Sequence, residues 1–66
     1  MKPPSLPKIG DAVEVHDTDV SDKWVRGEVK SVSSTHVTIV ARGATHHVPL
    51  DWYREHMGWR WSNHAS

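Results

Sequence analysis

Gly10-Asp11-Ala12-Val13-Glu14-Val15 and Trp24-Val25-Arg26-Gly27-Glu28-Val29 are the two stretches that decide the fold of this chain. In both, apolar residues alternate with polar or charged ones, which is the period of a strand with one buried face. The polar residues from Asp17 to Lys23 predict a loop between them. The two stretches therefore predict the first two strands of an antiparallel sheet.

The second strand is predicted to run from Trp24 to Ser33 and to be bent. Glycine weakens the middle of a strand, so Gly27 indicates a bend or the close approach of another backbone. Val32 is out of phase with the valines before it, and a bulge near Lys30 would return it to the core. A long strand bent in this way is typical of a very small barrel.

Three further strands follow. His36 to Ala41 alternates cleanly, Arg42-Gly43-Ala44 is a turn, and Thr45 to Leu50 is a strand that ends or lies at a sheet edge, because Pro49 has no amide hydrogen. A helical turn is predicted from Asp51, a preferred N-cap residue, to about His56, and a short strand from Gly58 to Trp61. The predicted core consists of Val13, Val15, Val25, Val29, Val37, Ile39, Val48 and Leu50.

The fold class expected from this pattern is all-β, a five-stranded small barrel with a short helical turn before the last strand. A chain of 66 residues forms one domain with a thin core. We divide it into a flexible proline-rich arm (1–8), the barrel (9–61) and a polar tail (62–66). Since so thin a core gains from additional burial, self-association into a homo-oligomer is an open prediction.

Composition excludes several classes of protein. Eight basic and eight acidic residues give no net charge, so a broad positive field for nucleic acid is absent. The chain has no cysteine, residues 1–7 lack the apolar run expected of a signal peptide, and no membrane-length apolar run follows, which predicts a cytoplasmic protein without a membrane partner.

The two opening stretches resemble those of SH3-like barrels, in particular the Tudor and Agenet-type modules, which begin Gly-Asp-x-Val-Glu-Val and continue Trp-x-x-Gly-x-Val. The resemblance covers roughly residues 9 to 61 and implies the fold more than the function. Tudor modules that bind methyl-lysine hold the cation in an aromatic cage. Of the cage positions, only Trp24 is aromatic in this chain, since His16-Asp17 and Val40-Ala41 occupy the others.

The chain is also similar in outline to the small plasmid-borne type B dihydrofolate reductases, which are SH3-like and form a tetramer around a pore. That family carries Val-Gln-Ile-Tyr before the proline of its catalytic stretch. This chain has Thr45-His46-His47-Val48 before Pro49, so the catalytic residues do not carry over. A reductase-like, pore-forming oligomer is the weakest of the functional alternatives.

No catalytic residue, metal ligand or cofactor site is predicted. His46 and His47 are adjacent in a strand and point to opposite faces, so they do not readily share a metal. The serines lie in tails and turns, without a motif that would activate a nucleophile. We therefore expect a protein that is not an enzyme.

Four tryptophans are more than so small a core can enclose, because each ring buries on the order of 200 Å². Tryptophan and arginine are enriched where binding energy is concentrated. We therefore expect a binding module that recognises a protein or peptide through an aromatic and histidine-bearing face. The predicted partner-binding residues are Trp24, Trp52, Arg54, Arg60 and Trp61.

The main alternative is a nucleic-acid-binding regulatory protein with a local basic face. Phosphates would be contacted by basic side chains, and Trp24 or Trp52 would stack on bases. The residues predicted for this face are Lys23, Arg26, Lys30, Arg42 and His47.

Overall fold

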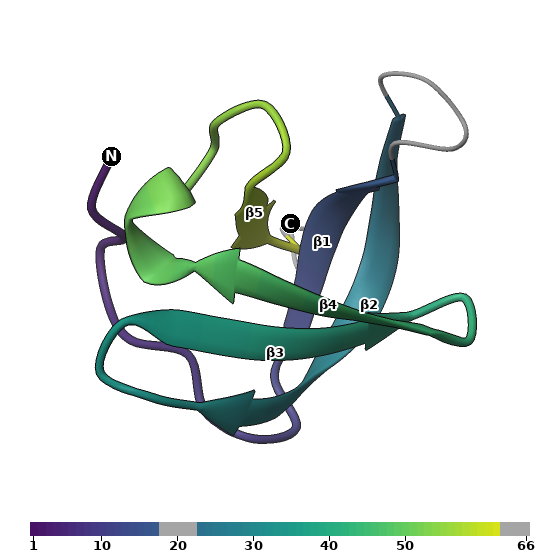
Figure 1. Cartoon of the computed structure of the whole chain (residues 1–66), viewed down its shortest axis with the longest axis horizontal. Coiled ribbons are helices and arrows are strands. Elements are labelled where there is room, and N and C mark those ends of the chain that lie inside the picture. The colour runs from purple at the N-terminus through teal and green to yellow at the C-terminus, as the bar shows by residue number, and fades with distance from the viewer. Residues whose placement is uncertain (18–22, 63–66) are drawn as a thin grey trace.

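The protein is a single curled sheet of five antiparallel strands (Figure 1), as seen in a computed structural model that describes residues 1–17 and 23–62. The loop predicted between the first two strands lies mainly outside the described residues, as does the predicted tail beyond Ser62. The strand order is β4-β3-β2-β1-β5. The strands are β1 (Ala12–Asp17), β2 (Lys23–Val32), β3 (His36–Ala41), β4 (Ala44–Pro49) and β5 (Trp59–Trp61).

The long strand β2 bends where the sequence predicts it. A Cβ atom on Gly27 would lie 2.7 Å from the carbonyl oxygen of Val40, so only glycine lets the two strands approach this closely. The pairing of β2 with β3 shifts between Val29 and Ser31, which confirms the bulge at Lys30. As a result, β2 pairs with β1 before the bend and with β3 after it.

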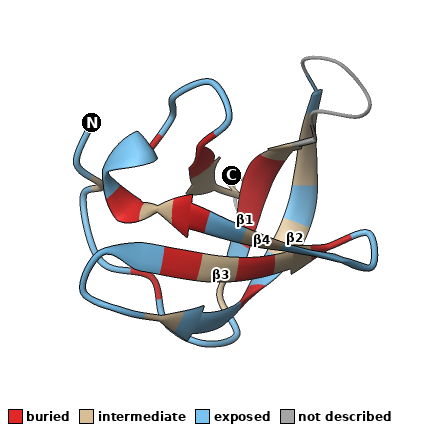
Figure 2. Ribbon diagram, in the orientation of Figure 1, coloured by how far each residue is buried: buried red, intermediate tan, exposed pale blue. Residues whose placement is uncertain are grey.

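The core lies inside the curl of the sheet (Figure 2). Every residue predicted for the core is buried except Val25, which is half-buried and packs against the cluster. Trp59 is fully buried, and its indole N–H donates a hydrogen bond to the carbonyl of Leu50. The buried apolar residues are Val13, Val15, Val29, Val37, Ile39, Ala41, Val48, Leu50, Tyr53 and Trp59.

The predicted helical turn is shorter than expected and begins earlier. It is a 3-10 turn at Leu50–Trp52 that follows Pro49 directly, without a side-chain cap, so Asp51 lies inside the turn instead of capping it. The turn ends because Tyr53 is extended and Arg54 has a φ of 63°. In the part of the chain that is described, no helix has the length and apolar character needed to cross a membrane.

The N-terminal arm follows the outside of the domain. Pro7 is buried, and the N-terminal ammonium group contacts the carbonyl oxygen of Asp51 and the carboxylate of Glu55. Leu6 and Ile9 remain mostly exposed. The mobility that the sequence predicts for residues 1–8 stays a prediction.

Replacing Ile39 with alanine tests the register of the sheet. Ile39 is fully buried on β3, so Ile39→Ala should lower the free energy of unfolding by roughly 2–5 kcal/mol. Val40 is on the opposite face of the same strand and is only half-buried, so Val40→Ala is the control and should cost less. Equal melting temperatures for the two variants in thermal denaturation would contradict this core.

Candidate functional site

A groove of about 330 Å³ lies along β4 and is the candidate binding site. Figure 1 shows β3 on one side of β4 and the segment that leads to β5 on the other. The groove is on this second side, where no described strand pairs with β4. Its lining comes from β4, the end of β1, the 3-10 turn and the segment before β5, and consists of Val15, His16, Thr45, His46, His47, Val48, Trp52, Met57 and Gly58.

Strand register determines which side chains of β4 face the interior. His46 is paired with Ile39, whose side chain is buried, so His46 points toward the inside of the curl and is half-buried. His47 is paired with Thr38 on the outer face, where its Nδ1 lies 3.0 Å from the Thr38 hydroxyl. The His46 ring therefore faces the inside of the curl, whereas the His47 ring is on the outer face.

His16, near the end of β1, also lines the groove. Its Nδ1 accepts a hydrogen bond of 2.8 Å from the backbone N–H of Met57. Because a backbone amide can only donate, the proton of the neutral ring must be on Nε2. His16 is thus held as a hydrogen-bond donor, and Met57 is held at a φ of 68° beside it.

Trp52 contributes the one tryptophan in the described lining of the groove. It is the last residue of the 3-10 turn, and at 44% exposed it is the tryptophan that stands furthest into solvent. Its carbonyl accepts a hydrogen bond from Glu55, which folds the following segment back toward β5. The lining of the groove therefore includes one exposed tryptophan and two half-buried histidines, His16 and His46.

A second cluster ties the three strands β2, β1 and β5 together on their outer face. Arg60 Nε donates to Glu14 Oε1, and the Arg60 guanidinium lies 4.5 Å from the centre of the Trp24 ring. Glu14 is only 8% exposed. The cluster continues to His16, whose ring centre is 4.1 Å from that of Trp24.

The five predicted partner-binding residues do not form one surface. Trp52 lines the groove, while Trp24 and Arg60 are engaged with each other outside it. Strand alternation separates Arg60 from Trp61, which packs against the core with its ring 5.4 Å from that of Trp59. Arg54 is exposed in the segment before β5.

The predicted basic face is interrupted by acidic residues. Arg26 is opposite Glu14 in the register of β1 and β2, and Lys30 lies 3.8 Å from Glu28. Lys23 is exposed at the start of β2, Arg42 is in the β3–β4 turn, and His47 bonds to Thr38. The positive charges therefore do not gather into a phosphate-binding stripe.

The histidines do not form a metal site among residues 1–17 and 23–62, which contain no group of three or more side chains able to hold an ion. His16 and His56 are in ring contact, with centres 4.7 Å apart. His36 is remote from them on β3 and bonds to Thr35. These rings contribute to packing and hydrogen bonding.

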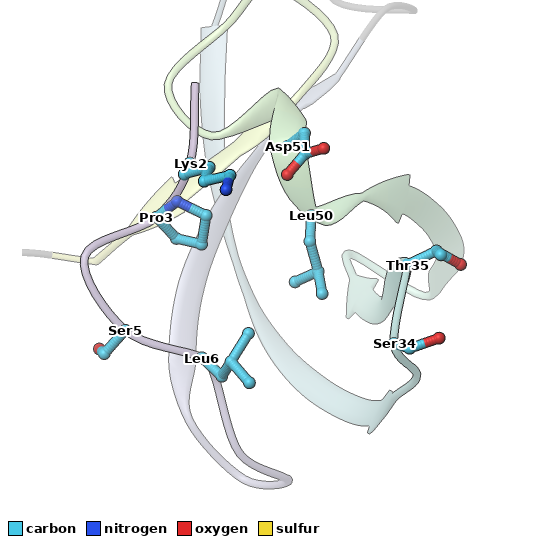
Figure 3. A pocket seen from close by; sticks show the side chains of 8 residues that line it. All are labelled: Lys2, Pro3, Ser5, Leu6, Ser34, Thr35, Leu50 and Asp51. Atoms are coloured by element: carbon cyan, nitrogen blue, oxygen red, sulfur yellow. The ribbon is translucent and has the colours of Figure 1, made fainter.

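A second cavity of about 300 Å³ lies between the N-terminal arm and the domain (Figure 3). Its walls come from Pro3 and Leu6 of the arm, Thr35 of the β2–β3 turn and Leu50. It has no aromatic residue and no histidine in its lining. The groove along β4 therefore has the richer recognition chemistry, although the two volumes are similar.

Comparison with known proteins does not suggest a function for this chain. The fold and the groove are therefore the basis for the functional proposal. No protein-family model, no curated protein and no solved structure matches the chain. The class that the structure itself defines is an all-β domain of five antiparallel strands, curled like a small barrel.

Sequence reasoning missed Met57 and the hydrogen-bonded role of His16. Neither residue belongs to a motif, and they meet only because β1 and the segment before β5 are adjacent in space, 41 residues apart along the chain. The sequence did contain one signal for the position of the groove. Pro49 predicts that β4 ends or lies at a sheet edge there. That prediction is confirmed, because β4 is an edge strand that ends at Pro49.

Removing the Arg60 cation tests the outer cluster. Arg60→Gln should lower the free energy of unfolding by about 1–3 kcal/mol, because the arginine is bonded to a largely buried carboxylate. Lys30→Gln is the control, since the pair of Lys30 with Glu28 is exposed and should contribute little. Urea denaturation that gives the same stability for both variants would contradict the role of Arg60.

Proposed function

We propose that this chain is a non-enzymatic binding module that recognises a protein or peptide segment in the groove along β4. The observation that carries the proposal is the convergence of Trp52, His16 and His46 on one groove beside an edge strand. Binding sites combine apolar and aromatic surface with a few placed polar groups, and this groove has both. The arm cavity lacks the aromatic part.

The finer description that we propose for the fold is an SH3-like barrel of the Tudor or Agenet type. The features that support it are the strand count, the bent second strand and the 3-10 turn before β5. A methyl-lysine cage is not part of the proposal, because Trp24 is covered by Arg60 and His16. We place the protein in the cytoplasm, as the lack of cysteine predicts, and leave self-association as a prediction.

The proposed ligand is a protein segment, in preference to nucleic acid. Phosphate binding needs neighbouring cations whose counterions are released. Arg26 and Lys30 are instead next to Glu14 and Glu28, which reduces the local potential. An aromatic groove gains its affinity from burial and hydrogen bonds, so binding should depend weakly on salt.

Selection from a library of short random peptides on the immobilised protein tests the proposal. Peptides retained by the parent should bind Trp52→Ala about tenfold more weakly or worse, because Trp52 is an exposed indole in the lining of the groove. Ile9→Ala is the matched control, an exposed apolar side chain outside the groove lining. Circular dichroism would verify that Trp52→Ala is folded, and equal affinities for the two variants would refute the groove as the binding site.

A further inference from the structure

The register of β4 determines which of its backbone groups are free. Arg42 and Gly43 form a two-residue turn with φ values of 54° and 80°, the type I′ geometry of tight hairpins. The pair that flanks such a turn, Ala41 and Ala44, exchanges both backbone hydrogen bonds. Pairs then alternate along β4, so the amide and carbonyl groups of Thr45 and His47 point away from β3.

Pro49 is the next residue of β4 whose backbone groups point away from β3, and a proline at this position agrees with the register. Pro49 is opposite His36 and has no amide hydrogen, so it costs the β3–β4 ladder nothing. The next amide, of Leu50, donates to the carbonyl of Thr35 and not to the groove. In the part of the chain that the structure describes, the free edge therefore consists of the outward groups of Thr45 and His47, followed by the carbonyl of Pro49.

This edge has little of the protection that edge strands usually have. Proteins guard exposed edges with charged side chains, proline, bulges or a covering segment, and β4 has a proline only at its end, Pro49. The sequence of β4, Ala-Thr-His-His-Val-Pro, contains no lysine, arginine or acidic residue. At the other edge of the sheet, β5 is covered, because Tyr53 bridges Trp59 and the Arg54 amide donates to the Trp59 carbonyl.

The groove lies where an additional strand would pair with β4. Neighbouring strands lie about 4.8 Å apart, so a chain paired with Thr45 and His47 would occupy the groove directly. His16 and Met57 also line the groove and would lie beside the added chain. If the added strand already belonged to another sheet, its neighbouring strands would meet His16 and Met57. An isolated extended segment has no such neighbours and avoids this conflict.

The lining chemistry favours acidic side chains on that segment. His16 lines the groove and carries its ring proton on Nε2, because its Nδ1 accepts from Met57, and the half-buried His46 adds a second imidazole. The described lining residues include no carboxylate. Since an imidazole N–H donates well to a carboxylate, this lining favours a glutamate or aspartate on the ligand.

We infer that the ligand is an extended, acidic peptide segment that adds to the sheet as a sixth strand along β4. The inference rests on the proposed function, since it specifies how the same groove binds. Backbone pairing with Thr45 and His47 supplies affinity, and the histidines and Trp52 select the side chains. The ladder stops at Pro49, where the amide is missing.

The test uses a capped peptide of alternating threonine and glutamate as the probe, with affinity measured by calorimetry. Thr45→Pro removes one outward amide without removing a bond to β3, and Pro49 shows that the strand accepts proline in this register. Thr45→Val retains the amide and is the matched control. We expect Thr45→Pro to bind the probe about tenfold more weakly than Thr45→Val.

The peptide is varied in parallel. In an extended peptide, successive backbone amides point to opposite sides, so only one of the two alternating sets can pair with β4. Methylation of that set should weaken binding by about the same factor as Thr45→Pro. Lysine in place of glutamate should also weaken it. Equal affinity of Thr45→Pro and Thr45→Val would overturn strand addition, and equal affinity of the glutamate and lysine peptides would overturn the acidic preference.

Other outcomes separate this inference from the proposed function. Loss of binding in Trp52→Ala, with no effect of Thr45→Pro, would retain the groove as the site and refute the pairing with β4. No effect of either variant would refute both. A parent protein that sediments as a dimer, with Thr45→Pro a monomer, would identify a second copy as the occupant of the edge and overturn the peptide proposal.

Discussion

The close approach of β2 to β3 at Gly27 is the constraint on which the rest of the structure depends. With Val40 O only 2.7 Å from the position of a Cβ atom, a larger residue would force the two strands apart. The bulge at Lys30 adds twist a few residues later. Together they let one ten-residue strand pair with β1 at one end and β3 at the other, so the sheet curls around its own core.

Curling of the sheet also positions both of its edges. β5 is short, and it is held from the outside by Glu14, Arg60 and Trp24 and from the inside by the buried ring of Trp59. The backbone of residues 53 and 54 covers its free side. Among residues 1–17 and 23–62, no strand pairs with the free side of β4, and the groove along it is lined by β4, the end of β1, Trp52 and the segment before β5.

The candidate site shows how a small domain can combine stability with a binding surface. The core uses Trp59 and Tyr53, whose rings meet at 5.1 Å, to fill the inside of the curl. Trp52, seven residues before Trp59, is turned outward by the 3-10 turn and remains exposed. The aromatic residues thus divide into packing and recognition roles according to their position around this turn.

Much of the fold could be predicted from local pattern. The alternation of Val37 and Ile39, the misfit of Val32 and the glycine at position 27 determined the strands, the bulge and the buried face, because strand period and backbone sterics act over a few residues. Pro49 in the same way indicated an edge. The sequence predicts the helical turn too late, with Asp51 as its cap, because the observed turn follows Pro49 directly at the end of β4. Only the tertiary structure brought Met57 to His16, set Arg60 over Trp24 and opened the groove beside β4. These contacts join residues far apart in the chain, and their geometry depends on how the sheet curls, which no short stretch of sequence encodes.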